Sequence, residues 1–125
     1  MLMTWKQCTV FVADDDKSVL ESLALLLESA GYQSRGFGSA EELLASGSVQ
    51  NACCLILDIK LPGMSGLQLL QVLAASHTPI PVVFITGHDC PGIEAQALGL
   101  GAVAYLRKPF DEQMLLDAIH PYCVN

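Results

Sequence analysis

The chain has 125 residues, of which 52% are hydrophobic and 15% are charged, and its formal net charge is −7. This length suits one domain, and the apolar content is high enough for a buried core, which argues against an intrinsically disordered protein. Only six Lys and Arg residues oppose thirteen Asp and Glu residues, so we expect no direct binding of nucleic acid by this chain.

The sequence indicates neither a membrane protein nor an oxidising compartment. No apolar run reaches the roughly 18 residues of a membrane span, and the first residues lack the pattern of a signal peptide, so a cytoplasmic protein is expected. The five cysteines form no Cys-x-x-Cys pair, and the adjacent Cys53 and Cys54 are expected to point to opposite faces of a strand. We interpret all five as small apolar core residues in a reducing environment.

Short apolar runs alternate with helical patterns along the chain. The first run, Thr9–Ala13, is β-branched, aromatic and apolar on both faces, which is typical of a buried parallel strand. Apolar residues at helical spacing predict a helix over Lys17–Ala30, and a more polar strand follows at Gln33–Phe37. Ser39 and the glutamate three residues later form the capping box of a second helix that ends near Ala45.

After a loop at Gly47–Asn51, six further elements continue the alternation. They are a strand at Cys54–Leu57, a helix capped by Ser65, a strand at Pro81–Thr86, a helix at Pro91–Leu100, a strand at Val103–Arg107 and a helix at Asp111–His120 that Pro121 ends. Gly92 and Gly99 each weaken the fourth helix by roughly 1 kcal/mol relative to Ala. Five strand–helix repeats with right-handed crossovers predict an α/β fold, with a five-stranded parallel sheet and five helices on both faces.

Four of the predicted strands end at residues that suit phosphate chemistry. Asp14 and Asp15 follow the first strand, Asp58 the third, Thr86 the fourth, and Lys108 the fifth. In a parallel α/β sheet, ligands bind beyond the carboxyl ends of the strands, so these side chains are expected to share one crevice. Three carboxylates, a hydroxyl and an ammonium together can hold a divalent cation and accept a phosphoryl group.

Four motifs carry a resemblance to a known family. They are Asp14-Asp15, the segment Leu57–Gly66 (Leu-Asp-Ile-Lys-Leu-Pro-Gly-Met-Ser-Gly), Ile85–His88 and Lys108-Pro109-Phe110. On these residues the chain resembles a response-regulator receiver domain of the CheY-like superfamily over essentially its whole length, residues 1–125. The Thr-Gly-His stretch and the stretch Gly101–Phe110 (Gly-Ala-Val-x-Tyr-Leu-x-Lys-Pro-Phe) are similar to FixJ-type receivers in particular. The resemblance implies the flavodoxin-like strand order 2-1-3-4-5.

The resemblance also implies a phosphoacceptor site. Asp58 would accept a phosphoryl group from a sensor histidine kinase or a phosphotransfer protein. Asp15, Asp58 and the backbone carbonyl of Lys60 would bind Mg²⁺ or Mn²⁺, with Asp14 reaching the ion through water. Lys108 would pair with the phosphoryl oxygens, and its peptide bond to Pro109 would be cis.

A conformational switch is a further implication of the resemblance. Thr86 would donate its hydroxyl to the phosphoryl group, and Tyr105 would fill the space that Thr86 leaves. Their movement would remodel the surface of the fourth helix, fifth strand and fifth helix, which suits a phosphorylation-dependent homodimer and a transcriptional output. By position alone, Tyr105 is instead a half-buried strand aromatic with its hydroxyl in water.

Some residues depart from the family pattern or lie next to its motifs. We hypothesise that Lys60 and His88, together with Gly87, set the lifetime of the phosphorylated state. The segment Asp89-Cys90-Pro91-Gly92 departs from the FixJ-type pattern, which leaves the start of the fourth helix open.

Two other functions fit parts of the pattern. A receiver-shaped interaction module that is never phosphorylated would not require the intact set of Asp14, Asp15, Asp58, Thr86 and Lys108. A phosphotransferase or phosphatase of the haloacid-dehalogenase type requires a second carboxylate two residues after its Asp, where this chain has Lys60. We therefore expect no conventional turnover enzyme, but a domain that catalyses its own phosphorylation and dephosphorylation. No output domain is expected within this chain.

Overall fold

A computed structural model describes residues 9–77 and 79–123 of the chain. Its strands are β1 (Thr9–Ala13), β2 (Gln33–Phe37), β3 (Ala52–Asp58), β4 (Val82–Thr86) and β5 (Ala104–Arg107). Its α-helices are α1 (Lys17–Ser29), α2 (Ala40–Ala45), α3 (Gly66–Ala75), α4 (Ile93–Gly99) and α5 (Glu112–Ile119). Two 3-10 turns, Val49–Asn51 and His120–Tyr122, precede β3 and follow α5.

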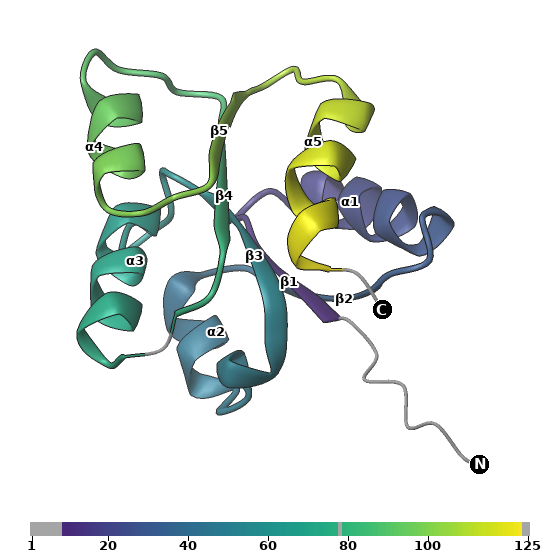
Figure 1. Ribbon diagram of the computed structural model, residues 1–125, viewed down its shortest axis with the longest axis horizontal. Coiled ribbons are helices and arrows are strands. Elements are labelled where there is room, and N and C mark those ends of the chain that lie inside the picture. The colour runs from purple at the N-terminus through teal and green to yellow at the C-terminus, as the bar shows by residue number, and fades with distance from the viewer. Residues whose placement is uncertain (1–8, 78, 124–125) are drawn as a thin grey trace.

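All five strands are parallel and form one sheet in the order β2-β1-β3-β4-β5. The helices α1 and α5 cover one face, and α2, α3 and α4 cover the other (Figure 1). This confirms the predicted α/β class, strand order and two-sided helical cover. Because each helix returns the chain to the start of the next strand, the carboxyl ends of all five strands lie at the same end of the sheet.

The core forms two layers, one on each face of the sheet. Along β1, Phe11 and Ala13 pack with α2, α3 and α4, whereas Val10 and Val12 pack with α1 and α5. This alternation follows from the two-residue period of a strand, and it explains why the predicted strands are apolar on both faces. Burying each large side chain contributes about 2 kcal/mol relative to leaving it exposed.

Most helix ends follow the predicted caps. The Ser39 side chain accepts from the third residue of α2, and Ser65 forms a complete capping box with Gln68 at the start of α3. The start of α4 differs from the prediction by two residues. Gly92 is its N-cap with a φ of 87°, so the helix begins only at Ile93. Glycine tolerates this left-handed conformation but has no side chain with which to cap the helix.

The structure also refines the prediction for the loop before β3 and the predicted end of α5. The loop expected at Gly47–Asn51 contains the 3-10 turn Val49–Asn51. The α-helical part of α5 ends at Ile119, but the chain winds on through a 3-10 turn that includes Pro121. Proline is tolerated in the first turn of a helix because its missing N–H has no helical partner there.

The cysteine interpretation needs correction at two places. Thr9 pairs with Ala52 whereas Val10 pairs with Cys54, so β3 has a one-residue bulge at Cys53. Cys53 and Cys54 consequently pack with the same core layer, and the expectation of opposite faces is wrong. Cys53 Sγ also lies 3.0 Å from the Sγ of the buried Cys123. Cys90 is exposed, so the interpretation of all five as core residues is wrong for that residue.

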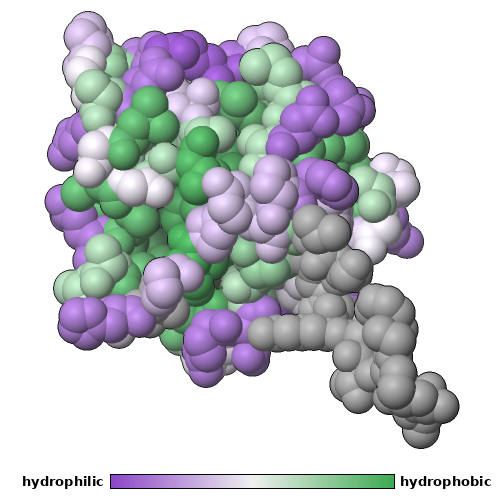
Figure 2. Space-filling view, viewed as in Figure 1, coloured by the Kyte–Doolittle hydropathy of each residue, from purple (hydrophilic) through white to green (hydrophobic). Residues whose placement is uncertain are grey.

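The surface is mixed in character. Figure 2 shows apolar residues in a strip between α3, α4 and the edge strand β5, with hydrophilic residues around the periphery. Over residues 9–77 and 79–123, no helix combines the length and the hydropathy that a membrane span requires.

Candidate functional site

Three carboxylates meet at the carboxyl ends of β1 and β3. Asp14 and Asp15 follow β1 directly, and Asp58 is the last residue of β3. One carboxylate oxygen from each lies within 4.8 Å of the other two. Asp14 is 0% exposed and Asp58 is 6% exposed, whereas Asp15 is exposed to solvent. The cluster therefore contains two buried acids and has one side that water can reach.

Lys108 connects the two buried acids. Its Nζ donates to Asp14 Oδ2 at 2.8 Å and to Asp58 Oδ2 at 3.4 Å. The peptide bond from Lys108 to Pro109 is cis, and the Lys108 N–H donates to the carbonyl of Thr86 at 2.7 Å. Burial lowers the pKa of the ammonium, but the hydrogen bond to Asp14 and the charge of Asp58 outweigh burial, so the pKa is raised overall.

The charge of Asp58 is opposed by its surroundings. Burial raises the pKa of its carboxyl, the N–H of Lys60 at 3.1 Å from Oδ1 lowers it, and the charge of Asp14 raises it, with an upward net shift. Two like charges about 4 Å apart repel by about 4 kcal/mol in the dielectric of a protein surface. A cation among these carboxylates would relieve both the burial cost and the repulsion.

The segment after β3 is held close to Asp58. A Cβ on Gly66 would collide with the backbone carbonyl oxygen of Asp58, so only glycine lets the start of α3 come this near. The Gly66 N–H donates to the carbonyl of Ile59 at 3.0 Å. From α2, a carboxylate oxygen of Glu41 accepts from the N–H of Met64 at 2.9 Å. These contacts hold the loop in place at the edge of the acidic cluster.

Thr86 and Gly87 lie at the same end of the sheet. Thr86 is the last residue of β4 and is buried. Its Oγ1 accepts from the N–H of His88 at 3.0 Å, which leaves the hydroxyl hydrogen for another acceptor. A Cβ on Gly87 would lie 3.7 Å from Lys108 Cδ, so this position borders the site. Lys60 and His88, two residues after Asp58 and Thr86 respectively, are exposed to solvent.

Tyr105 differs from what its position alone indicated. The residue is 7% exposed, and its hydroxyl donates to Asp89 Oδ1 at 2.8 Å. The interpretation of a hydroxyl in water is therefore wrong, because Asp89 in the loop after β4 reaches it. Sequence reasoning assigned no role to Asp89. The signal that could have found it was its place in the segment that departs from the FixJ-type pattern.

The donor set suits a hard divalent cation. The clustered ligand atoms are carboxylate oxygens, and Mg²⁺ prefers oxygen ligands while it retains several waters. The exposed side at Asp15 leaves water access to such an ion. The upward pKa shift of Asp58 also fits, since it reflects an unfavourable charge that a cation would stabilise. Asp15 and Asp58 are thus suitable side-chain ligands, with Asp14 within reach of a water on the ion.

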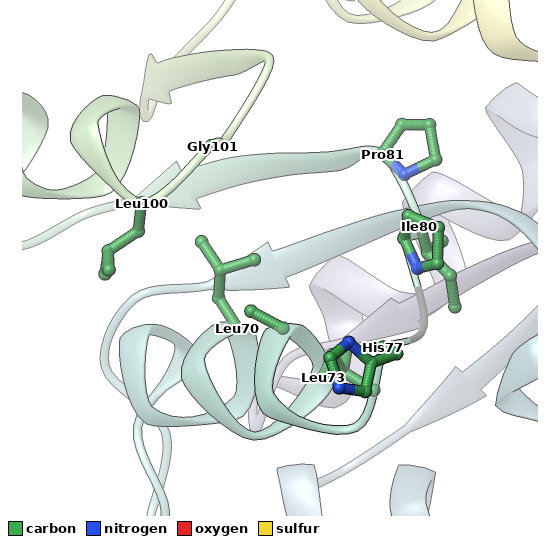
Figure 3. A pocket seen from close by; sticks show the side chains of 9 residues that line it. Leu70, Leu73, His77, Ile80, Pro81, Leu100 and Gly101 are labelled. Carbon is green, nitrogen blue, oxygen red and sulfur yellow. The ribbon is translucent and has the colours of Figure 1, made fainter.

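An apolar groove of about 590 Å³ lies at the opposite end of the sheet (Figure 3). Leu70 and Leu73 of α3, Ile80 and Pro81 before β4, and Leu100 after α4 contribute to its walls. Among the described residues that line it, none carries a carboxylate. This groove is therefore separate from the acidic cluster, and its lining is apolar apart from His77.

The model of the response regulator receiver domain family matches residues 10–120. The chain belongs to this family. The receiver domain is 46% identical over 110 residues to Nodulation protein W of Bradyrhizobium diazoefficiens, covering 88% of this chain and 48% of that protein. It is 40% identical over 110 residues to Transcriptional regulatory protein FixJ of Azorhizobium caulinodans, covering 88% of this chain and 52% of that protein.

Solved structures agree with these relatives. The crystal structure of FixJ-N superimposes on the receiver domain with a TM-score of 0.83 at 35% identity, covering 94% of each chain. The chain spans about half the length of the curated relatives it matches. The similarity therefore concerns the receiver part of those proteins.

Family membership confirms the resemblance seen in the motifs. Receiver domains of response regulators act in two-component signalling and interact with histidine kinases or phosphotransfer proteins. They bind Mg²⁺ at an acidic pocket, which agrees with the carboxylate cluster in this chain. They are generally not conventional enzymes.

Proposed function

We propose that Asp58 of this receiver domain accepts a phosphoryl group from a histidine kinase or a phosphotransfer protein. One observation carries the proposal: the Lys108 ammonium lies between the buried carboxylates of Asp14 and Asp58. An ammonium fixed in this position can pair with phosphoryl oxygens as soon as they reach Asp58. Residues 1–125 would form one such domain.

The chemistry would be a nucleophilic displacement at phosphorus. A carboxylate oxygen of Asp58 attacks, the phosphorus–nitrogen bond of the phosphohistidine breaks, and the imidazole leaves with the bonding electrons. Lys108 stabilises the charge on the equatorial oxygens, and the N–H of Lys60 holds the second oxygen of Asp58 in position. The hydroxyl of Thr86 would donate to the transferred group.

The ion in this proposal is Mg²⁺ or Mn²⁺. Asp15, Asp58 and the backbone carbonyl of Lys60 would hold it, with Asp14 acting through water. When bound, the ion supplies positive charge that offsets the carboxylates and the incoming phosphoryl oxygens. Because Asp14 already accepts from Lys108 and from the N–H of Asp16, an indirect role suits it better than direct ligation.

The output of the proposed switch is a change at the surface of α4, β5 and α5, with Thr86 and Tyr105 as its moving residues. We infer a transcriptional output because one relative is named a transcriptional regulatory protein. Phosphorylation would favour a homodimer through the same surface. The weakly capped α4 supports a movable element at this place.

Lys60, His88 and Gly87 would set the lifetime of the aspartyl phosphate. The exposed side chains of Lys60 and His88, and the absence of a side chain at Gly87, would decide how water reaches the phosphorus atom. We expect Lys60→Ala and His88→Ala each to change the decay rate several-fold. Decay at the wild-type rate in both variants would remove this part of the proposal.

The proposed phosphorylation is tested with acetyl phosphate and MgCl₂, followed by intact-mass measurement. We expect the wild-type chain to gain the mass of one phosphoryl group and Asp58→Asn to gain none. Asp117→Asn is a matched control, because it makes the same change on the exposed side of α5. The proposal is wrong if the wild type gains no mass, or if Asp58→Asn gains as much as the wild type.

Dimerisation is tested separately with beryllofluoride, which mimics the phosphoryl group. Light scattering after size exclusion should give twice the monomer mass with beryllofluoride and Mg²⁺, and the monomer mass with Mg²⁺ alone. If the chain is monomeric under both conditions, the proposed homodimer is refuted, while the proposed role of Asp58 as phosphoacceptor is unaffected.

A further inference from the structure

One acidic side chain in the loop between β4 and α4 is bound by two side chains of β5. Asp89 Oδ1 accepts from the hydroxyl of Tyr105 at 2.8 Å, and Asp89 Oδ2 accepts from Nε of Arg107 at 2.6 Å. Arg107 also donates through Nη2 to Glu94 Oε1 on α4, at 2.6 Å. The cluster therefore ties the loop, the edge strand and α4 together.

The contacts within this cluster differ in their surroundings. Tyr105 is buried among the α2, α3 and α4 layer of the core, and Arg107 covers its ring with 5.2 Å between guanidinium carbon and ring centroid. The ion pairs of Arg107 with Asp89 and with Glu94 are partly exposed, and such pairs contribute little by themselves. The hydrogen bond of the buried Tyr105 to a charged carboxylate is the stronger link.

Asp89 also lies near the phosphoryl chemistry along the chain. It is the third residue after Thr86, and the bond from the His88 N–H to Thr86 Oγ1 closes the intervening turn. Thr86 is itself held by Lys108, whose N–H donates to its carbonyl. The contacts thus form a short path from Thr86 through the turn to Asp89, and from Asp89 to β5 and α4.

We propose that Asp89 is a positioning residue that transmits movement of Thr86 to Tyr105, Arg107 and α4. The inference rests on the proposed phosphoacceptor function and adds the route by which its signal leaves the site. Phosphorylation chemistry does not require Asp89, because Asp89 is not part of the carboxylate cluster.

The test records which backbone amides change their NMR chemical shifts when beryllofluoride and Mg²⁺ are added, and how far from Asp58 these amides lie. In the wild-type chain we expect shifts near Asp58 and Thr86, and also in α4 and β5. In Asp89→Ala we expect the shifts near Asp58 and Thr86 to remain, while those in α4 and β5 fall several-fold. If Asp89 had only a structural role, its replacement would alter stability but would not reduce the shifts in α4 and β5 while leaving those near Asp58 and Thr86 unchanged.

Three further variants sharpen the test. Asp89→Asn keeps an acceptor oxygen for Tyr105 but lacks the charge. We therefore expect its shifts in α4 and β5 to lie between those of the wild type and those of Asp89→Ala. Tyr105→Phe removes only the hydroxyl and should behave like Asp89→Ala, which provides a second route if Asp89→Ala does not fold. Glu28→Ala removes an exposed carboxylate from α1, on the other face of the sheet, and should match the wild type.

The outcomes distinguish the two proposals. Full spreading in both Asp89→Ala and Tyr105→Phe would overturn the role of Asp89 while the phosphoacceptor function stands. No shift at Asp58 in the wild-type chain would overturn the phosphoacceptor function, and this inference with it. Loss of the shifts near Asp58 in Asp89→Ala would also overturn the inference, because Asp89 would then act on the site itself.

Discussion

At the scale of single residues, Asp58 shows how a reactive carboxylate is prepared. It is nearly buried, close to Asp14, and within reach of one ammonium. The opposing influences leave its pKa above the ordinary value of 3.8, so its charge is unfavourable in the folded chain without a cation. The folded state therefore tolerates an unfavourable charge at the position where function requires one.

Replacing Asp58 with Asn should stabilise the chain when divalent cations are removed. A carboxyl with a raised folded pKa contributes stability below its unfolded pKa, and that contribution is lost as the pH rises through the folded value. The advantage of Asn should thus appear as the pH rises above the unfolded pKa and be complete above the folded pKa, with a rise of a few degrees in Tm expected at neutral pH. Thermal unfolding in EDTA measures it, and a lower Tm for the variant at about pH 7 would contradict it.

Removing the ammonium should have the opposite effect. Lys108→Ala leaves the fully buried carboxylate of Asp14 without its cation, which is expected to lower the free energy of unfolding by about 2 kcal/mol. Lys17→Ala, at an exposed position at the start of α1, should stay within about 0.5 kcal/mol of the wild type. Urea denaturation at neutral pH compares the two, and equal losses would show that Lys108 does not stabilise Asp14.

At the scale of elements, the site depends on how closely α3 approaches β3. Gly66 begins α3 directly against the last residue of β3, and a Cβ there would also lie 3.0 Å from a ring carbon of Phe84. By contrast, the N-cap of α4 is Gly92, which has no side chain to cap the helix, and α4 ends at Gly99, where a Cβ would meet no atom within 4 Å. The start of α3 beside Asp58 is thus tightly packed, whereas α4 has an open glycine at each end, Gly92 and Gly99.

Two glycine substitutions should separate these elements. Gly66→Ala must displace α3 or β3 and is expected to lower the free energy of unfolding by about 2 kcal/mol and to slow phosphorylation of Asp58. Gly99→Ala should raise the free energy of unfolding by about 0.5–1 kcal/mol, because alanine is the better helix former. Chemical denaturation measures both changes. Similar effects of the two substitutions would mean that the packing against Asp58 is not restrictive.

At the scale of the whole molecule, the acidic cluster links metal binding to stability. The cluster exists only when β1 and β3 are paired, so a cation that binds it favours the folded chain. The five parallel strands thereby connect the chemistry at one end of the sheet to the folding of the entire domain.

Adding MgCl₂ at ten times its dissociation constant should raise the free energy of unfolding by about 1.4 kcal/mol. EDTA should reverse the change, and Asp15→Asn should weaken it because one ligand is lost. Asp117→Asn, distant from the cluster, should respond like the wild type. Thermal unfolding over a Mg²⁺ titration measures the effect, and an equal response in Asp15→Asn would rule out Asp15 as a ligand.

The sequence by itself determined the elements and the edge at which the site lies. Hydrophobic period and capping residues are local properties, which is why the predicted bounds of β1 and β2 coincide with the observed ones. Parallel pairing then requires Asp14, Asp58, Thr86 and Lys108 to meet at one end, whatever the details of packing. These conclusions needed only short-range patterns and the geometry of a parallel sheet.

The tertiary structure alone decided where register and loop conformation place particular side chains. The bulge at Cys53 depends on how β3 pairs with β1, and strand periodicity cannot show it. The bond from Tyr105 to Asp89 joins residues 16 positions apart through an irregular loop. No periodic pattern encodes such a contact, because it arises from side chains that meet only after the helices have packed on the sheet.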